Sequence, residues 1–115
     1  MPYIQIVTTK TLSADAKAEL KACVFSAASL LSKPKQYVMV HIVDGQTITK
    51  GDNNDNAAFC DARILGNASL SARDKFAAQL SADIARIAQT APTGVYLMIQ
   101  ELPTVYMDGM NLSGH

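Results

Sequence analysis

The second residue of the chain is a proline, and its nitrogen is the atom best suited to chemistry. Proline is small enough that a preceding initiator methionine is normally removed, which would leave Pro2 with a free secondary amine. An ordinary α-amino group has a pKa of about 7.7 to 8.0, and an apolar enclosure with a nearby cation would lower that pKa. Pro2 could then act as a general base near neutral pH. Alternatively, Pro2 only starts an edge strand, where its missing N–H does no harm.

Lys33 could supply the cation, because it stands where the first helix is expected to end. A lysine is also common there for a structural reason, since the helix dipole favours positive charge at the C-terminus. Tyr37 and Tyr96 could line a pocket, or could equally be packing aromatics with their hydroxyls at the surface. His41 is expected to be an ordinary strand residue, because Pro2 already fills the role of base.

The elements that would position these residues follow from the apolar periodicity, which predicts two strand-helix-strand units. Strands are predicted over 3–9, 37–43, 57–65 and 95–101. One helix of about five turns should begin after Ser13, and a second after Ser69 or Ser71. A crossover helix makes the two strands of each unit parallel, and its right-handedness puts both helices on one face of a single sheet. We therefore expect one α/β (α+β) domain over residues 1–115.

The composition indicates that the other face of the sheet is covered by further copies of the chain. The chain is 49% hydrophobic and 17% charged, which leaves little polar material to coat so small a domain. The predicted uncovered face carries large side chains, namely Tyr37, Met39, Tyr96 and Met98. Such a patch favours self-association. The alternative is that the predicted faces are shifted by one residue, which would exchange them.

Several classes of partner are not expected. Ten basic and ten acidic residues cancel, and no basic cluster could follow a phosphate backbone, so nucleic acid is not expected. No apolar run is long enough for a membrane helix, and no signal sequence is evident, so the expected location is the cytosol, with non-classical secretion as an alternative. Cys23 and Cys60 are expected to be buried thiols, without a disulfide or metal site.

An ordered set of segments resembles the macrophage migration inhibitory factor (MIF) family of the tautomerase superfamily. The segments are Pro2, KPKQYVMVHIVDGQ at 33–46, ILG at 64–66 and PTGVYLMI at 92–99. The resemblance implies two βαβ units with pseudo-twofold symmetry, a four-stranded mixed sheet and a homotrimer with active sites between subunits. It also implies a cofactor-independent isomerase, an intramolecular oxidoreductase of the phenylpyruvate or dopachrome tautomerase type, acting on small α-keto acids.

The same resemblance assigns roles to residues. Pro2 would be the catalytic base, Lys33 would pair with the substrate carboxylate, and the backbone N–H of Ile64 or Leu65 would hold a carboxylate oxygen. The remaining pocket residues would be Tyr96, donated by the neighbouring subunit, Tyr37 at the rim, and Tyr3 and Met98. Because the substrate's own carbonyl delocalises the developing charge, no cofactor or metal is expected.

The chain also departs from the family pattern. Met98 replaces an asparagine that meets a phenolic hydroxyl, so a hydroxyphenyl substrate should lose part of its preference. Met110 replaces a tryptophan at the pocket mouth, and Cys60 is the single thiol left of a CxxC motif, which removes dithiol redox chemistry. One alternative function is therefore a cytokine-type binding or signalling protein with a vestigial pocket and no receptor yet assigned. Another is hydration or decarboxylation of an unsaturated acid, for which Arg63 is the candidate arginine.

Overall fold

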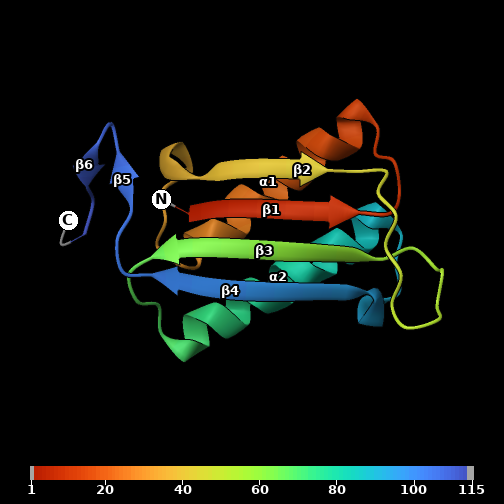
Figure 1. Ribbon diagram of the computed structural model, residues 1–115. Helices are drawn as coiled ribbons and strands as arrows, with labels where there is room; N and C mark the ends of the chain where they lie inside the picture. The colour runs from red at the N-terminus through yellow and green to blue at the C-terminus, as the bar shows by residue number, and fades with distance from the viewer. Residues whose placement is uncertain (1, 114–115) are drawn as a thin grey trace.

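Four strands form one sheet in the computed structural model, which describes residues 2–113 (Figure 1). They are β1 (Pro2–Thr8), β2 (Met39–Val43), β3 (Ala58–Leu65) and β4 (Val95–Leu102), in the order β2-β1-β3-β4. The helices are α1 (Ala14–Ser29) and α2 (Leu70–Ala88), and the short 3-10 turns η1 (Lys35–Tyr37) and η2 (Pro92–Gly94) precede β2 and β4. Met1, whose removal the Pro2 hypothesis requires, lies outside the described residues.

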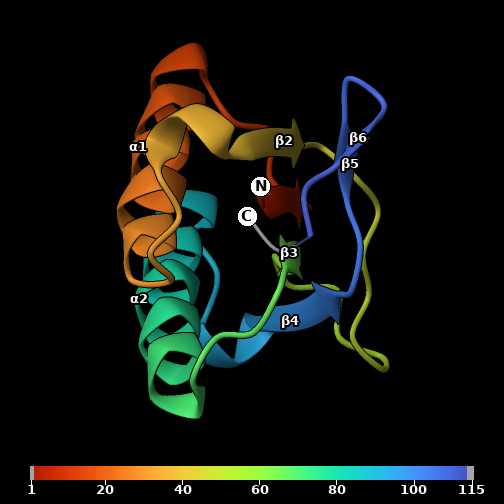
Figure 2. The same cartoon turned by 90° about the vertical axis from the view of Figure 1, so that its left-hand side faces the viewer.

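The strand pairing confirms the two predicted strand-helix-strand units. β1 is parallel to β2 and β3 is parallel to β4, while β1 and β3 run antiparallel at the centre of the sheet. Each parallel pair is joined through one helix, as a parallel connection requires. Figure 2 shows that both helices cover the same face of the sheet, which confirms the predicted two-layer arrangement.

Serine side chains fix where both helices begin. The Ser13 hydroxyl accepts a hydrogen bond from the Ala16 N–H at 3.1 Å, which confirms the predicted N-cap. The Ser69 hydroxyl accepts from the Ala72 N–H at 3.1 Å, so Ser69, and not Ser71, caps α2. These bonds satisfy backbone donors that the first helical turn leaves unpaired.

The core lies between the sheet and the helices, because alternate strand residues point to that side. In β1 and β3 these residues are buried and, apart from Thr8, apolar, and they pack against apolar residues of both helices. The principal members are Ile4, Ile6, Cys60, Ile64, Leu20, Val24, Phe76, Leu80 and Ile84. On the other face Met39 is 63% exposed and Tyr96 is 60% exposed. The predicted assignment of faces is therefore right.

Two local predictions need correction, and one element was not foreseen. Tyr37 does not begin a strand, because η1 holds it through hydrogen bonds from the Tyr37 N–H to the Pro34 carbonyl and from the Val38 N–H to the Lys35 carbonyl, both 3.1 Å. Cys23 is only partly buried. The C-terminal segment forms a hairpin of β5 (Tyr106–Met107) and β6 (Met110–Asn111), which was not predicted.

Candidate active site

Pro2 lies at the start of β1, inside an apolar part of the sheet. Its side chain is less than 2% exposed, and its Cα pairs with that of Ile64 on the neighbouring antiparallel strand. Ile4, on the same face of β1, and Ile64 are both fully buried. Burial of this kind disfavours a positive charge on an amine. The surroundings of Pro2 are those that the base hypothesis needs.

Lys33 reaches the same place from the end of α1. Ser32 adopts a left-handed backbone conformation with φ of 58°, and the Lys33 N–H returns to the Ala28 carbonyl at 3.1 Å. This turn ends the helix and redirects the chain. The Lys33 ammonium donates to the Leu65 carbonyl at 3.0 Å. Leu65 follows Ile64, the residue paired with Pro2, so the fold gathers Pro2, Lys33, Ile64 and Leu65 at one corner.

Tyr3 and His41 lie on the uncovered face of the sheet. The hydroxyl of Tyr3 and Nδ1 of His41 are 2.7 Å apart, and Nε2 of Gln5 lies 3.3 Å from the same ring nitrogen. Because side chains alternate along a strand, Tyr3 points away from the face on which Pro2 is buried. His41 is thus part of a hydrogen-bonded group on the sheet, in agreement with its expected role as a strand residue.

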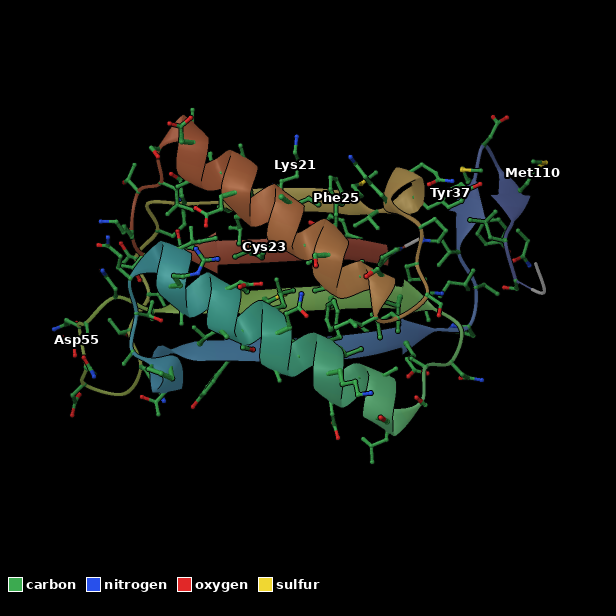
Figure 3. All side chains as sticks on the ribbon, turned by 180° about the vertical axis from the view of Figure 1, so that it is seen from behind. Lys21, Cys23, Phe25, Tyr37, Asp55 and Met110 are labelled. Carbon is green, nitrogen blue, oxygen red and sulfur yellow. The ribbon has the colours of Figure 1, made fainter. Side chains whose placement is uncertain are left out.

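Tyr37 stands at the Pro2 end of the molecule. Tyr3 is in register with Met39, so Tyr37 in η1 lies two residues before the level of Tyr3. Its side chain is 51% exposed. Figure 3 shows Tyr37 and Met110 at one end of the molecule and Asp55 at the other. A position at the rim of a pocket near Pro2 is compatible with this placement.

Tyr96 and Met98 lie far from Pro2 within one chain. Tyr96 pairs with Phe59, whereas Pro2 pairs with Ile64, five residues further along β3. At roughly 3.3 Å per residue that separation is about 17 Å. Met98 pairs with Asp61, three residues from Ile64, which is about 10 Å along the strand. The fold of one chain therefore brings neither Tyr96 nor Met98 to Pro2.

Arg63 is close to this corner but is paired with an acid. It is in register with Tyr3, and its guanidinium lies 3.2 Å from the Asp61 carboxylate, two residues away on the same face of β3. The Asp61 carboxylate offsets the positive charge of Arg63, which hydration or decarboxylation of an unsaturated acid would require. Arg63 is also half exposed, so this pair is expected to be weak.

The cysteines offer no reactive thiolate. Cys60 is fully buried, and this burial raises the pKa of its thiol to about 12. Burial also raises the pKa of Cys23, and the neighbouring Asp83 carboxylate adds to the rise. Both cysteines are free. Within residues 2–113 there is no group of three or more His, Cys, Asp or Glu side chains placed to hold a metal ion.

One contact of Tyr96 was not predicted from the sequence. The Lys50 ammonium lies 4.9 Å from the centre of the Tyr96 ring, on the loop between β2 and β3. The sequence offers no local signal for this contact, because the two residues are 46 positions apart.

Among the helices of the described part of the chain, none is long and apolar enough to cross a membrane.

Comparison with known proteins identifies the family. The family model described as macrophage migration inhibitory factor (MIF) matches residues 1–110. The chain therefore belongs to the MIF family, as the ordered motifs predicted.

Individual relatives are distant in sequence and close in fold. A macrophage migration inhibitory factor homolog of Brugia malayi is 33% identical over 66 residues, which span 57% of this chain and 57% of that protein. Leishmania major MIF2 superposes with a TM-score of 0.90 at 20% identity, covering 97% of both chains. A fused 4-OT protein, described as an asymmetric trimer, has a TM-score of 0.83 at 16% identity, with 95% of this chain and 94% of that chain covered.

Proposed function

We propose that the protein is a keto-enol tautomerase of small α-keto acids, such as phenylpyruvate, and that the Pro2 amine is its general base. One observation carries the proposal: the Lys33 ammonium binds the Leu65 carbonyl at 3.0 Å, beside Ile64, whose strand partner is Pro2. A cation and the buried Pro2 thus meet at one corner. Family membership adds support of a coarser kind, since fold alone does not fix a reaction.

The reaction begins with a neutral amine. While a residue precedes Pro2, its nitrogen is an amide without basicity, so removal of Met1 creates the base. The amine takes the proton from the carbon next to the keto group, the electron pair moves to the carbonyl oxygen, and the proton is returned to that oxygen. The reverse sequence converts enol to ketone. Lys33 holds the substrate carboxylate by a charge-assisted hydrogen bond, and the N–H of Ile64 or Leu65 binds a carboxylate oxygen.

The complete site belongs to a homotrimer. Tyr96 and Met98 are too far from Pro2 in one chain, yet both are exposed on the uncovered face. A neighbouring copy packed over this face at the Pro2 end of the sheet would bring its Tyr96 and Met98 towards Pro2, with Tyr37 at the rim and Tyr3 on the adjoining uncovered face. The asymmetric trimer of the fused 4-OT protein supports this arrangement by analogy of fold. In such a site Met98 favours an unsubstituted or aliphatic keto acid over a hydroxyphenyl one.

The decisive variant is Pro2→Gly. The N-terminal glycine still has a free α-amine, but a primary one in place of the secondary amine of proline. We expect at least a hundredfold loss of phenylpyruvate tautomerisation, the usual contribution of a positioned general base. Enol absorbance measures activity, and intact mass must show that Met1 is absent from the wild type. Retention of Met1 should abolish activity, whereas Lys75→Met, on the exposed side of α2, should leave it unchanged. Unaltered turnover by Pro2→Gly would refute the role of Pro2.

A second candidate is a binding or signalling protein with an inherited pocket. The observation in its favour is that Met98 and Met110, two flexible and exposed side chains, stand where the family pattern has residues that contact substrate. A folded trimer with Met1 removed and no turnover of any α-keto acid would favour this candidate.

A further inference from the structure

This inference rests on the proposed tautomerase site. We infer that Lys50 is a specificity-determining residue that favours α-keto acids carrying a second anionic group at the end of the molecule opposite the keto and carboxylate groups. The inference deepens the proposed function, because it assigns a residue and a substrate feature that the roles of Pro2 and Lys33 do not include. It depends on the placement of the Lys50 ammonium beside Tyr96.

The ammonium of Lys50 is held in place from two sides. Its Nζ donates to the Thr93 carbonyl at 2.7 Å and lies 4.9 Å from the centre of the Tyr96 ring. The ring face attracts a cation, and the distance is within the usual range of about 6 Å for such contacts. An ammonium has three N–H donors, and one is used by Thr93, so two can meet a ligand or water.

The backbone around Lys50 is also fixed. Lys50 and Asn53 form an isolated β-bridge, with N–H to carbonyl distances of 3.3 Å and 3.0 Å, across a turn in which Gly51 has φ of 59°. The Asn53 side chain then accepts from the Asp55 N–H at 2.7 Å. A long lysine side chain therefore starts from an ordered loop and reaches an ordered strand, which limits the freedom it must lose on binding.

The loop is further tied to the end of α2 and approaches the η2 turn on which Thr93 lies. The Asn56 side chain donates to the Gln89 carbonyl at 3.3 Å, and a Cβ at Gly94 would lie 3.2 Å from the Asn56 carbonyl oxygen. Glycine permits this close approach between the loop and the turn. Lys50 and Tyr96 are thereby held by segments that contact each other.

Charge decides what this arrangement selects. In the proposed trimer Lys33 binds the carboxylate next to the keto group, and Tyr96 of another copy forms the opposite wall. Met98 shares the exposed face of β4 with Tyr96 and offers no hydrogen-bond donor. The Lys50 ammonium is exposed in the single chain and is the positive charge that lies against the Tyr96 ring, where it attracts an anion through space. A dicarboxylic α-keto acid satisfies both lysines, whereas phenylpyruvate satisfies only Lys33.

The test compares 2-oxoglutarate, as the dicarboxylic acid, with phenylpyruvate by calorimetric titration of the trimer freed of Met1. We expect Lys50→Met to weaken 2-oxoglutarate binding about tenfold, the value of one charge-assisted hydrogen bond, and to change phenylpyruvate binding less than twofold. Lys50→Arg should retain most of the preference, because its guanidinium also carries a positive charge. Lys75→Met, with the same loss of charge on an exposed part of α2, should leave both affinities unchanged.

The results separate this inference from the proposed function. If Lys50→Met weakened the binding of 2-oxoglutarate and of phenylpyruvate equally, or weakened neither, the specificity role would be overturned. Failure of the wild type to bind 2-oxoglutarate more tightly than the Lys50→Met variant would overturn it as well. Because binding needs no turnover, a protein that binds selectively but fails the Pro2→Gly activity test would refute the base and leave the role of Lys50 supported.

Discussion

At the scale of single residues, Asp44 shows how one carboxylate joins distant parts of the chain. It accepts from the Leu12 N–H at 2.8 Å and lies 3.4 Å from the Lys17 ammonium. The hydrogen bond from Leu12 is the main cause that lowers the pKa of Asp44, and Lys17 adds to it. The contact holds the end of β2 against the segment that leads into α1.

This lowered pKa predicts a pH dependence of stability. The contribution of Asp44 is fully present above the ordinary pKa of about 3.9 and is lost as pH falls through the lower pKa of the folded state. Asp44→Asn should therefore lower the urea midpoint at pH 7, and the difference from wild type should narrow as the pH falls below 4. Asp52→Asn, on an exposed loop, is the control and should change little at any pH. A pH-independent difference for Asp44→Asn would contradict this account.

At the scale of elements, α2 is attached to the sheet by a stripe of large apolar side chains. Phe76, Leu80 and Ile84 recur at helical spacing and are fully buried. The exposed charged residues Asp74, Lys75 and Arg86 lie outside this stripe, as expected for a helix that packs by one face. α2 covers the sheet beneath β3 and β4, the strands that carry Ile64 and Tyr96, so its packing affects both halves of the proposed site.

Phe76 should therefore be essential for the attachment of α2. Phe76→Ala is expected to lower the free energy of unfolding by about 3 to 5 kcal/mol, through lost burial and the cavity left behind. Denaturant unfolding at one fixed chain concentration measures the effect, since assembly would make stability depend on concentration. Lys75→Ala, the exposed neighbour, should change it by less than about 0.5 kcal/mol. A loss below 1 kcal/mol for Phe76→Ala would contradict the assigned packing.

At the scale of the whole molecule, the sheet face away from the helices and the C-terminal hairpin both expose large side chains. The hairpin projects beyond the sheet at the end where β1 begins, on the side away from the helices (Figures 1 and 2). Within it Tyr106 is 62% exposed and Met110 is 61% exposed. A two-stranded hairpin has no core of its own, so it needs a surface to pack on. Both features fit a chain that buries apolar area against copies of itself.

Charge on the uncovered face should therefore prevent assembly. Met39→Glu places a carboxylate on a residue that is 63% exposed, and burying that charge without a partner would be costly. Sedimentation equilibrium should give three times 12.3 kDa for the wild type and a large shift towards the single-chain mass for Met39→Glu. Leu70→Glu is the matched control, because Leu70 is 65% exposed at the start of α2, on the helix side. A trimer that survives Met39→Glu would contradict this use of the face.

The sequence by itself determined the order of the elements, the start of α1, the apolar faces of β1 and β3 and the family, and it narrowed the start of α2 to Ser69 or Ser71. These features depend on local chemistry: period-2 and period-3.6 apolar spacing, serine caps and ordered motifs. Ile4 and Ile6 were assignable to the core because alternation needs no knowledge of distant contacts. Tyr37 was misplaced because its short apolar run fits a strand as well as it fits a 3-10 turn before one.

Only the tertiary structure decided which distant residues meet. The antiparallel pairing of β1 with β3 placed Ile64 opposite Pro2, and the left-handed turn at Ser32 returned Lys33 to the same corner. The parallel pairing of β3 with β4 put Tyr96 five residues along the sheet from that corner. The contact of Lys50 with Tyr96 arose from loop closure across 46 residues. No local pattern encodes such contacts, because strand register and chain reversal are settled by the packing of the whole domain.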